Sequence, residues 1–293
     1  MLILSAQAQQ DAIISTYQFN QLPINPAYEG AHNFTNIDLH YRNQWGDVEG
    51  APSSVFFSAN TFLPSKNMGA GLYIHHDAIG VTTQTRAFIG SSYKLHLSND
   101  QSLTFGLNIG IISLKYDFNE LLLEDPTDED FMNGNDRLSK FNIGSGLLFT
   151  KADKYYVGIS APQLLKMNET IAGFEGTRYY PHYYATAGVV FEVSRTFIKP
   201  YTNIRMVSRA PISYDLGVSA LFKERIWAGL FTRNFSNAGL NMFLTLENGM
   251  RLGYSGELVV GDPQVSSGYS THEVSIGIDL NWLEGQTVKR RFF

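Results

Sequence analysis

EVSIGIDLNW, residues 273–282, alternates between small or polar and large apolar side chains at every position. Val274, Ile276, Ile278, Leu280 and Trp282 would share one face of a β-strand, whereas a helix would scatter them around its circumference. Residues 104–114 and 182–193 have the same period of two. The alternation therefore predicts amphipathic strands rather than helices.

This period recurs from residue 36 to the end of the chain and defines about fourteen candidate strands. They lie at 36–45, 54–62, 68–76, 81–97, 101–115, 141–150, 154–161, 182–193, 196–207, 212–222, 225–233, 238–247, 250–257 and 271–282. Most are close to the length that a tilted strand needs to cross a bilayer. Only helices and closed barrels satisfy all backbone groups in lipid, so the pattern predicts an all-β transmembrane outer-membrane barrel of antiparallel strands.

Composition excludes several other classes of protein. The 293 residues include no cysteine, which rules out disulfide frameworks, thiolate metal sites and cysteine nucleophiles. A formal net charge of −5 without a basic stripe argues against a nucleic-acid partner. The sequence has no apolar run of about 18 residues, so a transmembrane helix is not expected.

The connections between the candidate strands alternate in length. The short ones lie at 63–67, 98–100, 151–153, 194–195, 223–224 and 248–249, and the long ones at roughly 116–140, 162–181 and 258–270. Outer-membrane barrels place short turns on the periplasmic side and long loops outside. We therefore expect a periplasmic N-terminus and three long external loops.

The sequence before the first strand divides into two parts. Residues 1–8 end in Ala6-Gln7-Ala8, a small-x-small pattern that predicts the remnant of a signal peptide, with a frayed soluble N-terminus as the alternative. Residues 9–35 form an N-terminal plug or periplasmic segment, and 36–293 form the barrel. Residues 18–30 are apolar and interrupted by prolines, which favours packing in the barrel mouth over a disordered periplasmic tail.

Aromatic residues suggest both a girdle and a filled lumen. Those near segment ends on the apolar face are Tyr41, Trp45, Tyr93, Tyr155, Tyr183, Tyr201, Phe222 and Trp282, which are typical of a membrane interface, although strand propensity also enriches aromatics. Four other aromatic residues and one leucine are expected to point inward: Phe56, Phe88, Leu148, Tyr184 and Trp227. The inward set favours a filled lumen or an apolar cargo over a wide aqueous pore. Pro200 inside a segment predicts a bulge.

The candidate catalytic and metal-binding side chains do not indicate an enzyme. Neighbouring strand residues point to opposite faces, so His75 and His76 would not share a metal. The acidic stretch 117–136 could be imagined as a calcium loop, but Met132 stands at a ligand position and Ser139 where a bidentate Glu is needed. We expect a solvated loop there, and neither a cofactor nor a metal.

Several motifs in order along the chain resemble the PorP/SprF family of type IX secretion system membrane proteins of Bacteroidetes-type bacteria. They are Gln18-Phe19-Asn20, Asn25-Pro26-Ala27-Tyr28-Glu29-Gly30, Tyr41-Arg42-Asn43-Gln44-Trp45 and Glu49-Gly50-Ala51-Pro52, followed by Gly69-Ala70-Gly71-Leu72, Ser160-Ala161-Pro162-Gln163-Leu164-Leu165, His182-Tyr183-Tyr184, Arg251-Leu252-Gly253-Tyr254 and Thr271-His272-Glu273-Val274. The chain departs from the family pattern after Tyr254, where an acidic residue usually follows sooner.

This resemblance implies an accessory barrel of type IX secretion. Such a barrel would bind or anchor secreted surface proteins, including large gliding adhesins, through their C-terminal sorting domains. It would also associate with periplasmic ring or lipoprotein components and with outer-membrane lipid. A fourteen-stranded barrel that is filled by a plug is too narrow for a folded protein, which favours an accessory role.

Other functions remain open at this point. A transporter of hydrophobic small molecules resembling the FadL family shares fourteen strands and a hatch with Asn25-Pro26-Ala27, although such transporters are much longer. A nonspecific porin conflicts with the inward aromatics, and an outer-membrane hydrolase lacks a catalytic constellation.

The candidate site is a partner or plug motif without catalytic residues. It comprises Phe19, Asn20, Asn25, Pro26, Ala27, Tyr28, Gly30, Tyr41, Arg42, Gln44, Trp45, Glu49, Gly50 and Pro52. Arg42 and Gln44 share a face with Asp38 and His40, and this face points inward if Leu39 and Tyr41 face lipid. From there Arg42 and Gln44 could hold the plug through charge-assisted hydrogen bonds. The alternative is that all these residues merely stabilise the barrel.

Overall fold

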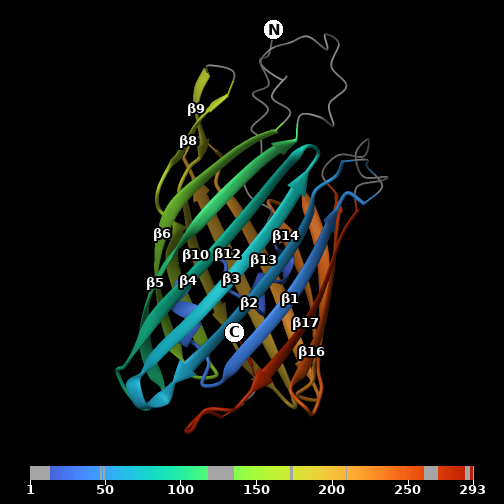
Figure 1. Ribbon diagram of the computed structural model, residues 1–293. Coiled ribbons are helices and arrows are strands. Elements are labelled where there is room, and N and C mark those ends of the chain that lie inside the picture. Colours follow the sequence, from blue (N-terminus) through green and yellow to red (C-terminus); the bar gives the residue numbers. More distant parts are fainter. Residues whose placement is uncertain are drawn as a thin grey trace.

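The computed structural model describes residues 14–46, 48, 50–117, 135–171, 174–208, 210–260, 270–287 and 291–292, which form a closed antiparallel β-barrel (Figure 1). The strands are β1 (Thr35–Gln44), β2 (Ser53–Leu63), β3 (Met68–Ile79), β4 (Thr82–His96), β5 (Gln101–Asp117), β6 (Asn135–Lys151), β7 (Tyr155–Gln163), β8 (Met167–Ile171), β9 (Phe174–Tyr179), β10 (His182–Val189), β11 (Phe191–Val193), β12 (Thr196–Val207), β13 (Ser213–Phe222), β14 (Ile226–Arg233), β15 (Asn237–Thr245), β16 (Met250–Val259) and β17 (Ser270–Leu280). Short 3₁₀ helices are η1 (Ser15–Gln18), η2 (Pro26–Gly30) and η3 (Pro64–Lys66). Within the described ranges, no helix is long and apolar enough to span a bilayer.

The barrel closes through pairing between its first and last strands. β1 pairs with β17, with Thr35 opposite Leu280, and β10 joins β7 to β12. β10 and β11 are two parts of one membrane-spanning strand, since both pair with β12. The described residues therefore form a barrel of fourteen strands, which confirms the expected fold. β8 and β9 form a separate hairpin within the connection between β7 and β10.

The two faces of the wall differ in chemistry as the alternation predicts. Leu107 and Leu230 point outward and are 66% and 65% exposed. Asn108, which follows Leu107, and Asn241 point inward and are buried. Apolar groups thus face the bilayer while polar groups face the lumen. His75 is buried and His76 is exposed, which confirms that the two histidines lie on opposite faces.

Most of the expected girdle residues lie on the outer face. Tyr41, Tyr93, Tyr183, Phe222 and Trp282 are exposed, while Tyr155 and Trp45 are half-buried. The prediction was wrong for Tyr201, which is buried and lies edge-on to Tyr17 inside the barrel, with 6.2 Å between ring centroids. The physical reason is the parity of β12, since Ile204 and Met206, at even positions, are exposed on the outer face.

The expected inward residues contribute to the luminal core. Phe56, Phe88, Leu148 and Trp227 are all buried, which confirms their orientation. Tyr184 is half-buried and lines a small luminal cavity together with Phe56.

The expected bulge at Pro200 was wrong. The register between β12 and β13 continues through Pro200, which faces Val218. On its other edge, β12 pairs with β10 up to Gly188 and with β11 from Phe191, in one unchanged register. The pairing is interrupted between them, at residues 189–190, which face Pro200 and Lys199. Proline has no backbone N–H, so it removes a ladder bond here without adding a residue.

Two polar regions extend the β-structure beyond its predicted ends. β6 begins at Asn135 rather than 141, because Arg137 and Ser139 pair with Lys115 and Ser113 of β5. Outside lipid, strand pairing does not need an apolar face, so hydrophobic alternation gave no signal. The β8–β9 hairpin was missed inside the predicted loop 162–181 for the same reason. Most of the acidic stretch, residues 118–134, lies outside the described residues.

One end of the barrel is built from tight turns. Asn67, Asp153 and Ser194 adopt left-handed backbone with φ between 53° and 58°, and Gly249 has φ of 82°. These conformations allow very short connections between antiparallel strands. We call this end the short-turn mouth. The β8–β9 hairpin lies at the other end (Figure 1).

Candidate functional site

Residues 14–34, which we call the luminal segment, lie inside the barrel. Their helices η1 and η2 contact inward-facing wall residues: η2 contacts β2 to β6, and η1 contacts β16. Buried members include Tyr17, Phe19, Leu22, Ala27 and Tyr28. The segment is thus packed against inward-facing parts of the wall.

The start of the luminal segment is held by carboxylates of β16 and β17. The backbone N–H groups of Ser15 and Thr16 donate to the two carboxylate oxygens of Glu273 at 2.7 and 3.0 Å. The Ser15 hydroxyl donates to Glu257 at 2.9 Å. All four residues are buried, so these charge-assisted bonds form away from bulk water.

Arg42 links this anchor to β1. Its Nη1 donates to the Ser15 hydroxyl at 3.2 Å and forms an ion pair with Glu273, and its Nη2 donates to Gln44 at 3.3 Å. On the same inward face, the His40 Nδ1 lies 3.0 Å from the Thr16 hydroxyl. Arg42 therefore contacts the luminal segment directly, and Gln44 contacts Arg42.

A second arginine completes the network, and sequence reasoning missed it. Arg233 of β14 binds Asp215 at 2.9 Å and Glu257 at 3.1 Å. Its inward parity was readable from the strand pattern, but the pairing of charges from β13, β14 and β16 depends on the strand register.

Phe19 and Asn20 attach the middle of the segment to different strands of the wall. The Phe19 ring lies 3.6 Å from that of Phe243 and 6.0 Å from that of Trp227, measured between centroids. Asn20 donates through Nδ2 to the Ser58 hydroxyl at 2.7 Å and to Asp38 at 3.3 Å. These two motif residues combine aromatic packing with amide hydrogen bonding.

The motif 25–30 forms η2 for local reasons. The Asn25 side chain caps the helix by accepting from the Ala27 N–H at 2.9 Å, and Pro26 occupies the first turn, where its missing N–H is harmless. The Asn25 amide also donates to the Leu147 carbonyl of β6 at 3.1 Å. Tyr28 packs edge-on to Tyr156 of β7, with centroids 6.5 Å apart.

Glycines on the wall make room for η2. A side chain at Gly106 would overlap the backbone of Pro26 and Ala27, and one at Gly69 would overlap that of Gly30. Gly30 itself could not carry a Cβ without meeting the Ser92 hydroxyl at 2.5 Å. Gly69 of β3 and Gly106 of β5 pair with Ser92 of β4 from either side, and we call these three positions the glycine cradle.

The remaining motif residues lie in the wall and at its rim. Tyr41 points outward. Trp45, with φ of 54°, Gly50 and Pro52 belong to the connection between β1 and β2, where the Pro52 carbonyl accepts from the Gln44 N–H at 2.9 Å. Glu49 lies outside the described residues.

The chain beyond β17 returns to the short-turn mouth, which sequence reasoning did not anticipate. The Thr287 N–H donates to the Asn33 carbonyl at 2.8 Å, and the Gln286 amide donates to the Phe62 carbonyl at 2.8 Å. Arg291 donates through Nε to His32 at 3.1 Å. Phe292 is buried against Phe197, with centroids 5.0 Å apart. We call the described residues 281–287 and 291–292 the return tail.

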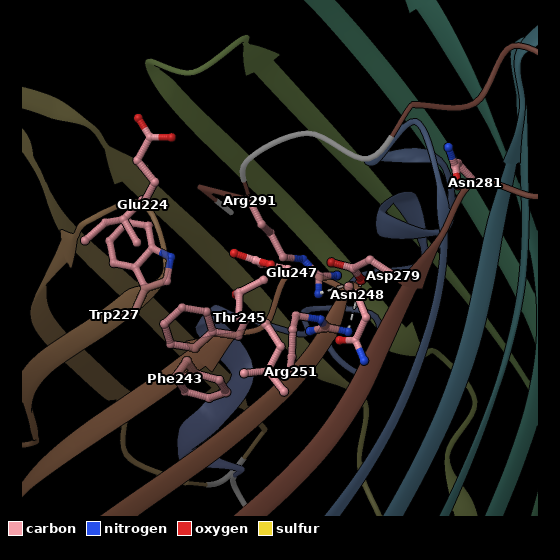
Figure 2. A pocket seen from close by; sticks show the side chains of 14 residues that line it. Glu224, Trp227, Phe243, Thr245, Glu247, Asn248, Arg251, Asp279, Asn281 and Arg291 are labelled. Carbon is pink, nitrogen blue, oxygen red and sulfur yellow. Dashed lines mark ion pairs between the residues drawn. The ribbon is translucent and has the colours of Figure 1, made fainter.

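A cavity of about 290 Å³ lies between the return tail and the short turns (Figure 2). Phe19, Trp227 and Phe243 form one wall, and Arg251 and Arg291 lie beside them. Asp279 lies between these two guanidinium groups, 3.2 Å from Arg251 and 3.7 Å from Arg291. The cavity thus combines an aromatic surface with fixed cations.

Burial shifts the pKa of three groups in the luminal segment and return tail. It raises the pKa of Glu29 to about 9 and lowers that of His32 well below its ordinary value, with Arg291 adding to the second effect. Burial, assisted by Arg251, lowers the pKa of Arg291 to about 10. At neutral pH Glu29 is therefore protonated, and His32 is a neutral acceptor for Arg291. Within the described residues, no group of three or more His, Asp or Glu side chains could hold a metal ion.

The family described as type IX secretion system membrane protein PorP/SprF matches residues 6–278. The chain belongs to this PorP/SprF family. It is a bacterial outer-membrane component of the type IX secretion system. No curated protein matches the chain.

Solved structures with the same barrel fold come from several outer-membrane proteins. The Pseudomonas putida toluene transporter TodX has a TM-score of 0.53 at 9% identity, over 90% of this chain and 94% of that one. The CymD monoaromatic hydrocarbon channel has a TM-score of 0.51 at 11% identity, over 89% and 91%. Acinetobacter baumannii Omp33 has a TM-score of 0.50 at 6% identity, over 84% and 98%. At these identities the likeness concerns the fold alone.

Proposed function

We propose that this PorP/SprF member is an accessory component that binds or anchors specific secreted surface proteins, such as large gliding adhesins, through their C-terminal sorting domains. The proposal is supported by membership of this family and by the contacts that residues 14–34 make with inward-facing side chains. The luminal segment is bonded to β1, β2, β6, β16 and β17, and a lumen occupied in this way favours an accessory role over a conduit for a folded protein. The cargo then crosses through a separate translocon, and this barrel acts on it at the surface.

The end with the long connections is the surface that fits this role. The β8–β9 hairpin lies there as a separate two-stranded sheet, whose strands have edges with backbone groups open to pairing. A sorting domain could pair with such a strand edge or pack on the loops between them. The short-turn mouth faces the opposite way, toward periplasmic ring or lipoprotein components.

The test is a deletion strain complemented with a tagged copy. We expect loss of one or a few large proteins from the cell surface, while other type IX cargo is still exported. Affinity purification from the complemented strain should recover the same proteins, together with periplasmic machine components. Normal surface display of all cargo in the deletion strain would contradict the proposal.

The alternative is a FadL-like transporter of hydrophobic small molecules. Inward aromatics such as Phe56, Tyr73 and Phe88 are the observation in its favour. These rings, however, pack in one cluster with Leu22 of the luminal segment, and the cavity beside Phe56 and Tyr73 is only about 40 Å³. Uptake of a labelled apolar compound that depends on this protein, with unchanged surface display, would favour the transporter.

A further inference from the structure

β11 has an open strand edge at the short-turn mouth. β7 pairs with β10 as far as Tyr155 opposite Val189, and the Val190 N–H then donates to the Lys154 carbonyl at 2.6 Å. β11 continues beyond this point and pairs only with β12. Its other edge therefore has no neighbouring strand among the described residues, and an edge of this kind is a template for pairing with another chain.

The backbone of Glu192 points to this open edge. Successive residues of a strand direct their N–H and C=O groups to alternate edges, so Glu192 points the same way as Val190, whose N–H reaches Lys154. Within the described part of the chain, no backbone bond from Glu192 is formed on this side. One residue of an added strand can therefore exchange two hydrogen bonds with Glu192.

An open cavity of about 1090 Å³ lies beside the edge. Phe197 and Phe292 line it from the lumen, and Val189 and Phe191 line it along the strand. Phe191 is 54% exposed, and Val193, which lies further along the same outer face, is 52% exposed. A short extended segment thus has room beside β11 and meets apolar side chains on both of its faces.

Acidic side chains also line this cavity. Asp100 is paired with Lys151 at 3.6 Å, whereas Asp153 and Glu192 form no ion pair with any described residue. Lys154 is the only basic residue among the described residues of the lining. Glu192 belongs to the open strand itself, and opposite charges on directly paired residues stabilise a strand pair. The residue that pairs with Glu192 is therefore expected to be Lys or Arg.

We propose that the open edge of β11 binds an extended segment of a partner protein, which has the pattern apolar–basic–apolar and adds to β11 as a further strand. The basic residue pairs with Glu192. The two apolar residues lie beside Phe191 and Val193 on the outer face, because neighbouring strand residues point to opposite faces. Main-chain bonds supply affinity in strand addition, and the alternate side chains supply specificity.

A second copy of this chain fits the edge poorly. Two β11 strands that pair antiparallel about Glu192 place two like charges opposite each other, which is destabilising. The orientation given under the proposed function makes the partner a periplasmic protein, but the binding itself does not depend on that orientation. A measurement on the purified barrel does not involve surface display, so failure of either proposal can be told from failure of the other.

The test uses the purified full-length barrel in detergent and the fluorescence anisotropy of labelled peptides. The probes are nine-residue peptides in which threonine alternates with valine, with lysine or glutamate at the central position. A third probe is the lysine peptide methylated at its central backbone nitrogen. We expect the lysine peptide to bind at least about fivefold more tightly than the other two. Glutamate opposes Glu192, and methylation removes the N–H that strand addition needs.

Variants at position 192 assign the binding to the edge. Glu192→Gln keeps the N–H and should bring the lysine and glutamate peptides to within about twofold of each other. Glu192→Pro also removes the N–H on the open edge but no bond to β12, so it should weaken the lysine peptide at least about fivefold more than Glu192→Gln does. Glu284→Lys, at an exposed acid of the return tail, is the matched control and should change neither affinity.

Several outcomes would overturn the proposal. They are no binding of the lysine peptide, equal affinity of the parent for the lysine peptide and either other probe, and an unchanged preference in Glu192→Gln. A parent barrel that is a dimer and becomes a monomer in Glu192→Pro would also overturn it, because the occupant of the edge would then be a second copy.

Discussion

At the scale of single residues, Arg42 shows how a polar side chain inside a barrel gains its partners. It contacts Ser15 of the luminal segment and the buried Glu273, and it lies 4.0 Å from Glu257. Removing one partner of a buried ion pair leaves an uncompensated charge, which is far more costly than losing a surface pair.

Arg42→Gln is therefore expected to lower the free energy of unfolding by about 3 kcal/mol and to loosen the luminal segment. The control Arg225→Gln removes an exposed pair with Glu247 and should cost less than about 1 kcal/mol. Urea unfolding in detergent measures both. If Arg42→Gln is as stable as the control, Arg42 does not hold the luminal segment.

Glu29 is expected to make the free energy of unfolding depend on pH. Burial raises the pKa of its carboxyl from 4.5 to about 9, so the folded protein binds this proton more tightly than the unfolded chain does. The resulting stability is fully present below pH 4.5 and is lost as the pH rises toward 9. Glu29→Gln should flatten the fall in urea midpoint between pH 5 and pH 8. A parallel slope in both proteins would contradict this assignment.

At the scale of elements, the glycine cradle positions η2. Gly106→Ala places a methyl group against the backbone of Pro26 and Ala27 and should displace the helix. The chain has no cysteine, so Gln21→Cys, at a buried position, can serve as a reporter of accessibility. We expect faster maleimide labelling of this reporter when Gly106→Ala is added.

Gly256→Ala is the matched control for the cradle. Its Cβ would lie 3.1 Å from the Tyr254 hydroxyl, the end of a movable side chain, and should not alter the labelling rate. Equal rates for the two alanine variants would mean that the cradle does not set the position of η2.

Pro200 separates β10 from β11 by removing one donor from the ladder. Pro200→Val supplies an N–H and a side chain suited to the lipid face, so the unfolding free energy should rise by about 1 kcal/mol. Amide exchange should show a protected N–H at position 200, whereas Ile204→Val in the same strand leaves the exchange pattern unchanged. A rapidly exchanging amide at that position would contradict the explanation.

At the scale of the whole molecule, the luminal segment and the return tail meet at the short-turn mouth, where Thr287 bonds to Asn33. The lengths of the connections predict that this mouth faces the periplasm. Single cysteines can test this in whole cells with a maleimide that does not cross the outer membrane. Lys166→Cys, beside β8, should be labelled, and Asn99→Cys, in a short turn, should react only after lysis. The reverse pattern would invert the orientation.

The barrel could be predicted from the amino-acid sequence, because lipid on one side and a polar lumen on the other impose a period of two on every membrane-spanning strand. Strand number, most strand bounds and the inward parity of Arg42 were readable from that period. Strand extensions outside lipid, such as the start of β6, left no such signal. The parity of Tyr201 was misassigned, although the aliphatic residues of β12 carried it.

The contacts inside the barrel could not be predicted from local sequence patterns. The contacts of Ser15 with Glu257, of η2 with the glycine cradle and of Arg291 with His32 join positions far apart in the sequence. A local pattern specifies which way a side chain points from its strand. Which groups it then meets depends on closure of β1 onto β17 and on the path of the two chain ends inside the ring, and no local spacing encodes either.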